Sequence, residues 1–167
     1  SAIHSNTVTW VVVETAAMVA EANKLLVRSG LTFVDSIARA RDDHASFDIT
    51  HVSSALQYTS SPRMFLDELL KLNSEELIFE KLVLTEKKRQ LYFNQYSLLG
   101  DNIPGSSRRI DLVTRATRYR LIALPQLEFF NAIQDSYEIV SLELDPVESH
   151  LPYFKGLKQF TIRLMRR

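Results

Sequence analysis

The repeated change of apolar spacing over residues 62–164 constrains the fold of this chain more than any other feature of its sequence. A helix-like spacing is followed by two stretches of strand-like alternation, and this order then occurs a second time. Two amphipathic helices on one face of a four-stranded sheet would bury both sets of apolar side chains. We therefore predict an α+β fold, with a ferredoxin-like αββαββ sandwich whose sheet is antiparallel. The six segments are 62–73, 77–84, 89–99, 126–135, 137–144 and 158–164.

Local signals support these segments. Ser61 followed by Pro62 is typical of a helix start, with Ser as N-cap and Pro at the first helical position. The polar residues 85–88 separate two strand-like stretches, which predicts a hairpin. A helical spacing over 108–123 lies within an insertion at 100–125. The apolar phase of each element predicts one core. Its members are Leu66, Leu69, Phe79, Phe93, Phe130, Ile139, Phe160 and Ile162.

The N-terminal third admits two interpretations. Residues 7–13 are rich in β-branched side chains, as strands are, but Val12, Val19, Leu26 and Phe33 recur every seven residues, which is typical of a helix with a coiled-coil seam. We favour the helix, and divide the chain into a helical or stalk region over 1–60 and a ferredoxin-like domain over 61–167. The stripe formed by these four residues then faces either the core or a protein partner in a homodimer or heterodimer.

The composition excludes many catalytic chemistries. The 167 residues include no Cys and only four Gly, so that thiol catalysis and the Gly-rich phosphate loops are both absent. The four His residues form no HExxH zinc motif. We therefore predict a chain that is not an enzyme and that holds neither cofactor nor metal.

The charge balance argues against a nucleic-acid partner. Twenty basic and twenty acidic residues give a formal net charge of zero, whereas nucleic-acid binding usually needs a basic surface. On a helical 108–123 segment, Arg108, Arg115 and Arg118 would share one face. This face is either an ordinary solvated surface or a patch that binds an acidic partner.

Three parts of the chain resemble a known family. The segment MFLDELL at 64–70 with LIF at 77–79, the segment FFNAIQDS at 129–136 with IVSL at 139–142, and GLKQFTIRL at 156–164 resemble the periplasmic parts of the inner-membrane assembly-platform proteins of type IV pilus and type II secretion machines. The resemblance implies a non-enzymatic protein of pilus assembly or protein secretion. It also implies pairing with itself or a paralogue, and leaves room for a membrane anchor ahead of Ser1.

Two other settings stay open. A cytoplasmic location fits a chain without cysteine as well as a periplasmic one does. The alternative function is an extracytoplasmic ligand-sensing domain of a signalling receptor, which would need a pocket lined by converging polar groups.

Overall fold

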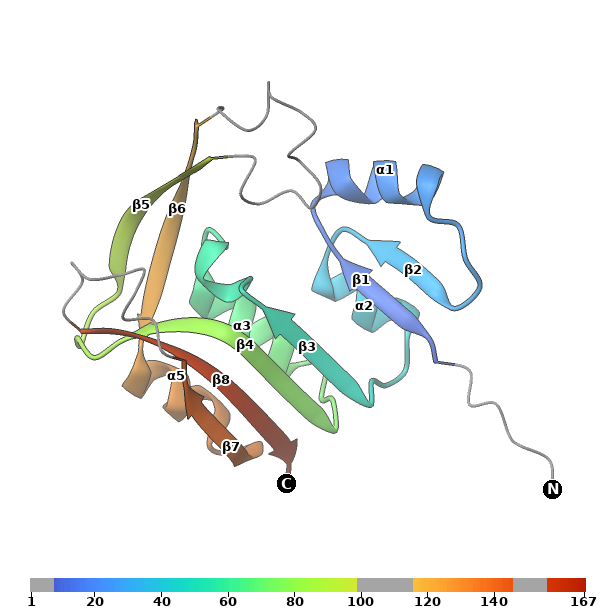
Figure 1. Ribbon diagram of the computed structural model, residues 1–167. Helices are drawn as coiled ribbons and strands as arrows, with labels where there is room; N and C mark the ends of the chain where they lie inside the picture. Colours follow the sequence, from blue (N-terminus) through green and yellow to red (C-terminus); the bar gives the residue numbers. More distant parts are fainter. Residues whose placement is uncertain (1–7, 99–115, 146–155) are drawn as a thin grey trace.

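The computed structural model describes residues 8–98, 116–145 and 156–167, and shows an α/β arrangement with two sheets (Figure 1). The smaller sheet holds the parallel pair β1–β2, and the six-stranded sheet has the order β5–β6–β4–β8–β7, with β3 also paired to β4. The described elements are β1 (Trp10–Val13), α1 (Ala16–Leu25), β2 (Leu31–Val34), α2 (Ile37–Asp43), β3 (Ile49–Ser53), the 3-10 helix η1 (Leu56–Tyr58), α3 (Pro62–Leu70), β4 (Glu76–Thr85), β5 (Leu91–Leu98), β6 (Ala116–Pro125), α5 (Gln126–Ile133), β7 (Tyr137–Leu144) and β8 (Leu157–Arg166).

Strand β4 is the centre of the larger sheet. It pairs in parallel with β3 along its first half, in parallel with the end of β6 at Leu84 and Thr85, and antiparallel with β8 along its length. A bulge interrupts the β4–β8 register between Phe79 and Leu82, where Lys81 has a φ of 53°. Such bulges bend a strand and increase its twist, and the bend lets the two ends of β4 serve different neighbours.

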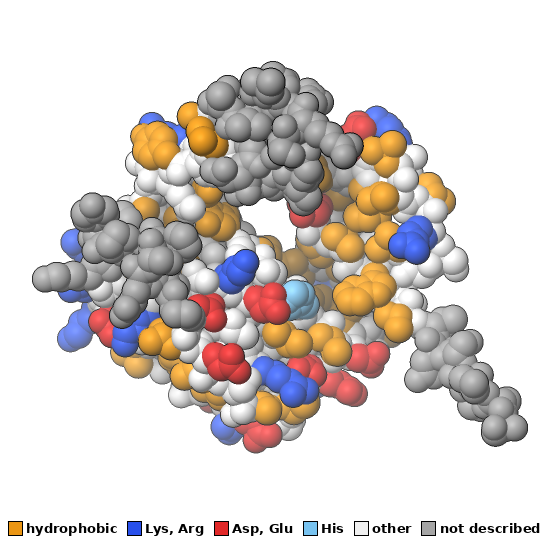
Figure 2. Space-filling model, in the orientation of Figure 1, with side chains coloured by type: hydrophobic (Ala, Val, Ile, Leu, Met, Phe, Trp, Pro, Cys, Tyr) orange, Lys and Arg blue, Asp and Glu red, His pale blue; other side chains and the backbone are white. Residues whose placement is uncertain are grey.

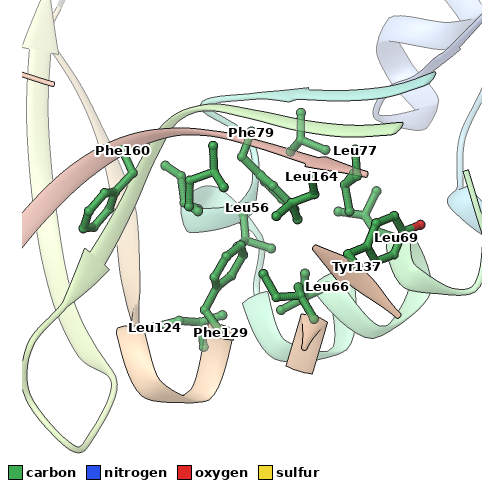
Figure 3. Packing of buried hydrophobic residues seen from close by; sticks show 14 of the residues in the cluster. Leu56, Leu66, Leu69, Leu77, Phe79, Leu124, Phe129, Tyr137, Phe160 and Leu164 are labelled. Carbon is green, nitrogen blue, oxygen red and sulfur yellow. The ribbon is translucent and has the colours of Figure 1, made fainter. Parts of the chain in front are cut away.

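The main core lies between the sheet and the helices α3 and α5 (Figure 3). Phe79 of β4 meets Phe129 of α5 edge-to-face, with ring centroids 5.2 Å apart, a favourable aromatic geometry. Leu66 on α3 and Leu56 on η1 close the same cluster, and all four side chains are fully buried. A second, smaller cluster joins β4 to the β5–β6 hairpin. Its buried members are Val83, Leu121 and Ala123.

The predicted ferredoxin-like sandwich with an N-terminal helical region is wrong. Residues 10–13 and 31–34 are the parallel strands β1 and β2, and the larger sheet is mixed rather than antiparallel. The seven-residue apolar spacing does not indicate a single helix here, because the repeat runs through β1, α1 and β2. Its residues therefore do not share one helix face. Gly30, with a φ of 76°, ends the turn that leads into β2. The boundary between 60 and 61 stays a prediction.

Most of the separate elements from residue 62 onward are confirmed. Helices α3 and α5 and strands β4, β5, β7 and β8 lie where the spacing places them. The predicted pairing of β4 with β5 is wrong, since β5 pairs antiparallel with β6 instead. The predicted helix over 108–123 is wrong where the structure describes it, because residues 116–125 form β6; residues 108–115 lie outside the described residues.

The predicted core is correct in part. Five of its members are buried in the main cluster, namely Leu66, Leu69, Phe79, Phe160 and Ile162. Phe130 packs against that cluster at its margin, and Phe93 packs against the smaller cluster instead. Ile139 is 48% exposed, and it lies on β7, an edge strand of the larger sheet.

Candidate functional site

Three parallel strands end at the same edge of the molecule, and each end carries a polar side chain. In Figure 1 the arrowheads of β1, β2 and β3 point to one side. Glu14 follows β1, Asp35 follows β2 and Ser54 follows β3. The carboxyl ends of parallel strands are where open α/β sheets bind ligands. This edge is therefore the first place to look for a site.

The two carboxylates lie on neighbouring strands. The Glu14 backbone N–H donates to the Val34 carbonyl at 3.0 Å, which extends the β1–β2 ladder by one residue. The Glu14 carboxylate itself accepts one hydrogen bond, from the N–H of Thr15 at 3.2 Å. Thr15 in turn caps α1, because its hydroxyl accepts from the Met18 N–H. Both carboxylates are exposed. Asp35 forms a partly exposed ion pair with Arg39 at 3.5 Å, and such surface pairs are weak, so that both carboxylates can still be reached by a ligand.

Figure 2 shows an opening between the β1–β2 pair and the larger sheet. Within the part of the chain that the structure describes, β1 pairs only with β2, and β3 pairs along its length only with β4. Each of these strands therefore has one backbone edge without a strand partner there. Trp10 of β1 and Ile49 of β3 are more than half exposed.

A pocket of about 730 Å³ lies at the end of β3. Its described lining comes from the turn after β3, from η1 and the residues that follow it, and from the β5–β6 hairpin. Ser54, the first residue of the lining in sequence, has a left-handed backbone conformation with a φ of 50°. Its backbone N–H donates to the Glu80 carbonyl at 2.9 Å. The described lining residues are Ser54, Tyr58, Thr59, Ser60, Gln95, Tyr119 and Arg120.

Two tyrosines form an aromatic corner of this pocket. The rings of Tyr58 and Tyr119 meet edge-to-face, with centroids 5.4 Å apart and planes at 75°. The Tyr58 hydroxyl donates to Oε1 of Gln95 at 3.1 Å. Burial, and then the neighbouring Tyr119 phenol, raise the pKa of Tyr58 above its usual value, although the bond to Gln95 works in the opposite direction. Tyr58 is therefore protonated at neutral pH and acts as a hydrogen-bond donor, not as a base.

Gln57 holds this corner against the bulge of β4. Its side chain is 3% exposed, and its Nε2 donates to the Lys81 carbonyl at 2.9 Å. Its Oε1 has no hydrogen-bond partner among the described residues. Because Gln57 is next to Tyr58 in η1, the bulge fixes the position of the pocket's aromatic wall.

The structure separates the residues of the predicted stripe. Val12 lies in β1, Val19 in α1 and Phe33 in β2, while Leu26 is the C-cap of α1. The continuous coiled-coil helix that carried this hypothesis is thus not formed. A role for these four residues in a protein interface stays a prediction.

The predicted arginine patch falls partly outside the described residues, where Arg108 and Arg115 lie. Arg118 is on β6, and its guanidinium lies over the ring of Tyr96, 5.9 Å from the centroid. Its role toward an acidic partner stays a prediction. Within the described ranges, no group of three His, Asp or Glu side chains is placed to hold a metal ion. Nor is any helix of those ranges long and apolar enough to cross a membrane.

Comparison with solved structures identifies the fold. No protein-family model matches the chain, and no curated protein matches it either. A putative S-adenosylmethionine-dependent methyltransferase from Listeria monocytogenes superposes with a TM-score of 0.52 at 12% identity, covering 95% of this chain and 80% of that one. The [4+2]-cyclase SpnF superposes with a TM-score of 0.51 at 11% identity, covering 96% of this chain and 68% of that one. The chain thus has a methyltransferase-like fold.

This finding corrects the resemblance to pilus and secretion platform proteins, which is wrong. The solved structures that share the fold are methyltransferase-like, not assembly platforms. The predicted non-enzymatic function in pilus assembly or secretion rested on that resemblance and is wrong with it. The expectation that the chain is not an enzyme is corrected on the same ground, since the two matched structures are described as a methyltransferase and a cyclase.

Sequence reasoning missed the residues of this edge. One signal was available for the carboxylates: the apolar stretches ending at Val13 and Val34 are each followed at once by an acidic residue, which is the pattern of a parallel strand with a polar end. No comparable signal existed for Tyr58 and Tyr119, which are 61 residues apart and meet only through tertiary packing.

Proposed function

We propose that this chain acts as an S-adenosylmethionine-dependent methyltransferase. The observation that carries the proposal is the juxtaposition of two carboxylates, Glu14 and Asp35, at the ends of adjacent parallel strands, in a chain with a methyltransferase-like fold. The pocket beside η1 would hold the methyl acceptor. Ligand sites at the carboxyl ends of parallel strands are the rule for open α/β sheets.

The residues present suit this cofactor. S-adenosylmethionine carries no phosphate, so the absence of a Gly-rich phosphate loop from the sequence does not argue against it. Its ribose has two hydroxyl donors, its adenine has an amino donor, and its sulfonium is positive. Exposed carboxylates accept hydrogen bonds and balance positive charge. Glu14 would hold the ribose hydroxyls and Asp35 the adenine amino group.

The cofactor and the protein side chains would have different roles in the reaction. The cofactor, when bound, supplies a methyl group that is electrophilic because it is attached to a positive sulfur. The protein binds and orients the acceptor beside it. The Tyr58 hydroxyl donates its proton to Gln95, so its oxygen would accept a hydrogen bond from the ligand, and the raised pKa keeps Tyr58 protonated so that it positions the ligand without removing a proton. The bulge of β4, held by Gln57, keeps this tyrosine in place.

The experiment is calorimetric titration of the 167-residue chain with S-adenosylmethionine and with S-adenosylhomocysteine. Glu14→Gln should weaken binding by about tenfold or more, which corresponds to about 1.4 kcal/mol or more. The matched control is Glu21→Gln on α1, an exposed glutamate that pairs only with Lys24 among the described residues. It should leave binding unchanged. Absence of binding by the unmodified chain, or equal weakening by the two variants, would contradict the proposal.

A further inference from the structure

We infer that the pocket between η1 and the β5–β6 hairpin binds a sugar-like ligand: a hydroxyl-rich ring that is neutral or negatively charged. As the identity of a methyl acceptor, this inference rests on the proposed function. As a binding site, it rests only on the residues of the pocket.

The size and construction of the pocket suit a small molecule. Its volume of about 730 Å³ lies within the range of ordinary ligand sites. Its walls come from segments that are distant in sequence, since Ser54 and Tyr58 precede β4 whereas Gln95 and Tyr119 belong to the hairpin. These walls are fixed to one another through the tyrosine pair and the bond from Tyr58 to Gln95. The pocket is therefore preorganised.

The aromatic corner suits the apolar face of a sugar ring. Tyr58 is 40% exposed and Tyr119 is half-buried. Both rings line the pocket, with their planes at 75° to each other. Tyrosine combines a flat apolar body with a polar tip, so a ring that has C–H groups on one face and hydroxyls around its rim matches both parts. A purely apolar ligand would leave the polar tips unused.

The remaining polar groups suit hydroxyls. The hydroxyls of Ser54, Ser60 and Tyr119 and the Nε2 of Gln95 make no hydrogen bond within the described residues. Hydroxyl groups both donate and accept, whereas the amide Nε2 only donates. A ligand with several hydroxyls, each able to donate and to accept, can pair with every member of this set and can use the acceptor capacity of the protein hydroxyls as well as their donors.

The charge of the lining selects against cations. The described lining includes no Asp or Glu, and its one charged residue is Arg120. Arg120 forms no ion pair with any other described residue. A positively charged amine would therefore find no counter-ion in this lining, while a carboxylate or phosphate on the sugar would be tolerated.

The test uses three probes on the whole chain: methyl β-D-glucopyranoside, D-glucuronate and D-glucosamine. Binding is followed by the shifts of backbone amide signals in NMR titrations at pH 7. The glucoside and the glucuronate should give saturable shifts at the residues of η1 and the hairpin. D-glucosamine, which is cationic at this pH, should bind at least about five times more weakly than glucuronate.

Matched variants assign the site. Tyr119→Ala should weaken the binding of the glucoside by about tenfold, while Tyr92→Ala, on an exposed position of the same hairpin, should leave it unchanged. If Tyr119→Ala fails to fold, Gln95→Met preserves side-chain length and removes only the amide, and should weaken binding about threefold.

The inference is overturned if neither the glucoside nor the glucuronate gives saturable shifts up to about 50 mM, if the shifts map elsewhere, or if Tyr92→Ala weakens binding as much as the pocket variants do. Sugar binding without S-adenosylmethionine binding would remove the proposed function and leave this site standing. Binding of the cofactor without binding of any sugar would do the reverse.

Discussion

The β1–α1–β2 unit and the body formed by β3 to β8 differ sharply in how far they bury their own apolar side chains. In the body, six residues of β4 alone are buried, and the main core has contributions from η1, α3 and α5 as well as from α2. In the β1–α1–β2 unit only Val34 is buried, and α1 buries no residue at all. A two-stranded sheet has too little area to stabilise itself. The unit is therefore ordered largely by its neighbours.

This difference bears on the candidate site. The carboxylates Glu14 and Asp35 belong to the weakly buried unit, whereas the tyrosine pocket belongs to the body. Helix α2 links the two, because Ile37 and Ala40 are buried while its ends connect β2 to β3. A cofactor bound at the carboxylates would stabilise the unit by mass action, whereas a ligand of the pocket would meet walls that are already fixed.

The largest difference should appear when core side chains are truncated. Phe79 is fully buried against Phe129, so Phe79→Ala should cost about 3–5 kcal/mol of unfolding free energy. Val12, an apolar residue in the middle of β1, is only half-buried. Val12→Ala should therefore lower the unfolding free energy by less than about 1 kcal/mol. Urea unfolding measures both. Similar losses at the two sites would mean that the unit is as well packed as the body.

Hydrogen exchange should separate the two regions without mutation. Amides of β1 and β2 should exchange through local opening, at least about a hundredfold faster than those paired between β4 and β8, whose protection should approach the global limit. Adding S-adenosylmethionine should slow exchange in β1 and β2 selectively. Uniform protection across both sheets would show that the chain opens as one unit.

A substitution at Gly30 should destabilise the smaller unit specifically. Gly30 has a φ of 76°, and an added Cβ would lie 2.9 Å from the Val8 carbonyl oxygen. Gly30→Ala should cost about 1–2 kcal/mol in local stability from the backbone conformation alone, with the contact adding to it. Gly156→Ala is the control, because its φ of 92° is also unfavourable but its Cβ would meet only a flexible lysine end at 3.4 Å. Exchange rates in β1 and β2 should rise only in the first variant.

The smallest expected effect concerns acid stability of the body. Arg163 of β8 donates two hydrogen bonds to the Glu76 carboxylate of β4, the second at 3.2 Å, and these bonds lower the pKa of Glu76. A pKa lowered in the folded state means stability that is present above the unfolded value of about 4.3 and is lost as the pH falls through the folded value.

Arg163→Gln should therefore reduce the dependence of the urea unfolding midpoint on pH in the acid range. The part of that dependence that comes from other carboxylates should remain. Urea midpoints measured between pH 3 and 6 for the two proteins give the comparison. If the two profiles are parallel, the pair contributes nothing to the pH dependence. The effect should be modest because the Arg163 side chain is about half exposed and exposed ion pairs are weak.

Local sequence signals were sufficient for the elements that local physics stabilises. Pro62 at the first helical position of α3, and the apolar spacing that includes Leu66 and Leu69, place this helix correctly. The alternation in β8 correctly places Phe160 and Ile162 inward. These features depend on the restricted backbone of proline and on the spacing of apolar residues within one helix or strand. Both can be recognised from a short stretch of consecutive residues.

Where a strand pairs was not decided locally. Strand β5 follows β4 after a short polar turn, yet it pairs with β6, which begins 18 residues after β5 ends. The bulge at Lys81 bends β4, which pairs with β3 before the bulge and with the end of β6 after it, while β8 pairs with β4 on both sides of the bulge. The exposure of Ile139 also depends on pairing between distant segments, since pairing with β8 places β7 at the edge of the larger sheet.

The sequence by itself determined the helices and strands from residue 62 onward other than β6, most of the buried phenylalanines and the absence of cysteine chemistry. Tertiary structure alone decided that residues 10–34 form a strand, a helix and a strand, because a seven-residue apolar repeat satisfies a coiled coil and a βαβ-like segment equally well until neighbouring strands are present to pair. It also brought Tyr58 to Tyr119 and aligned the ends of β1, β2 and β3. Hydrogen bonds between strands and contacts between distant side chains depend on chain segments that no short stretch of sequence contains.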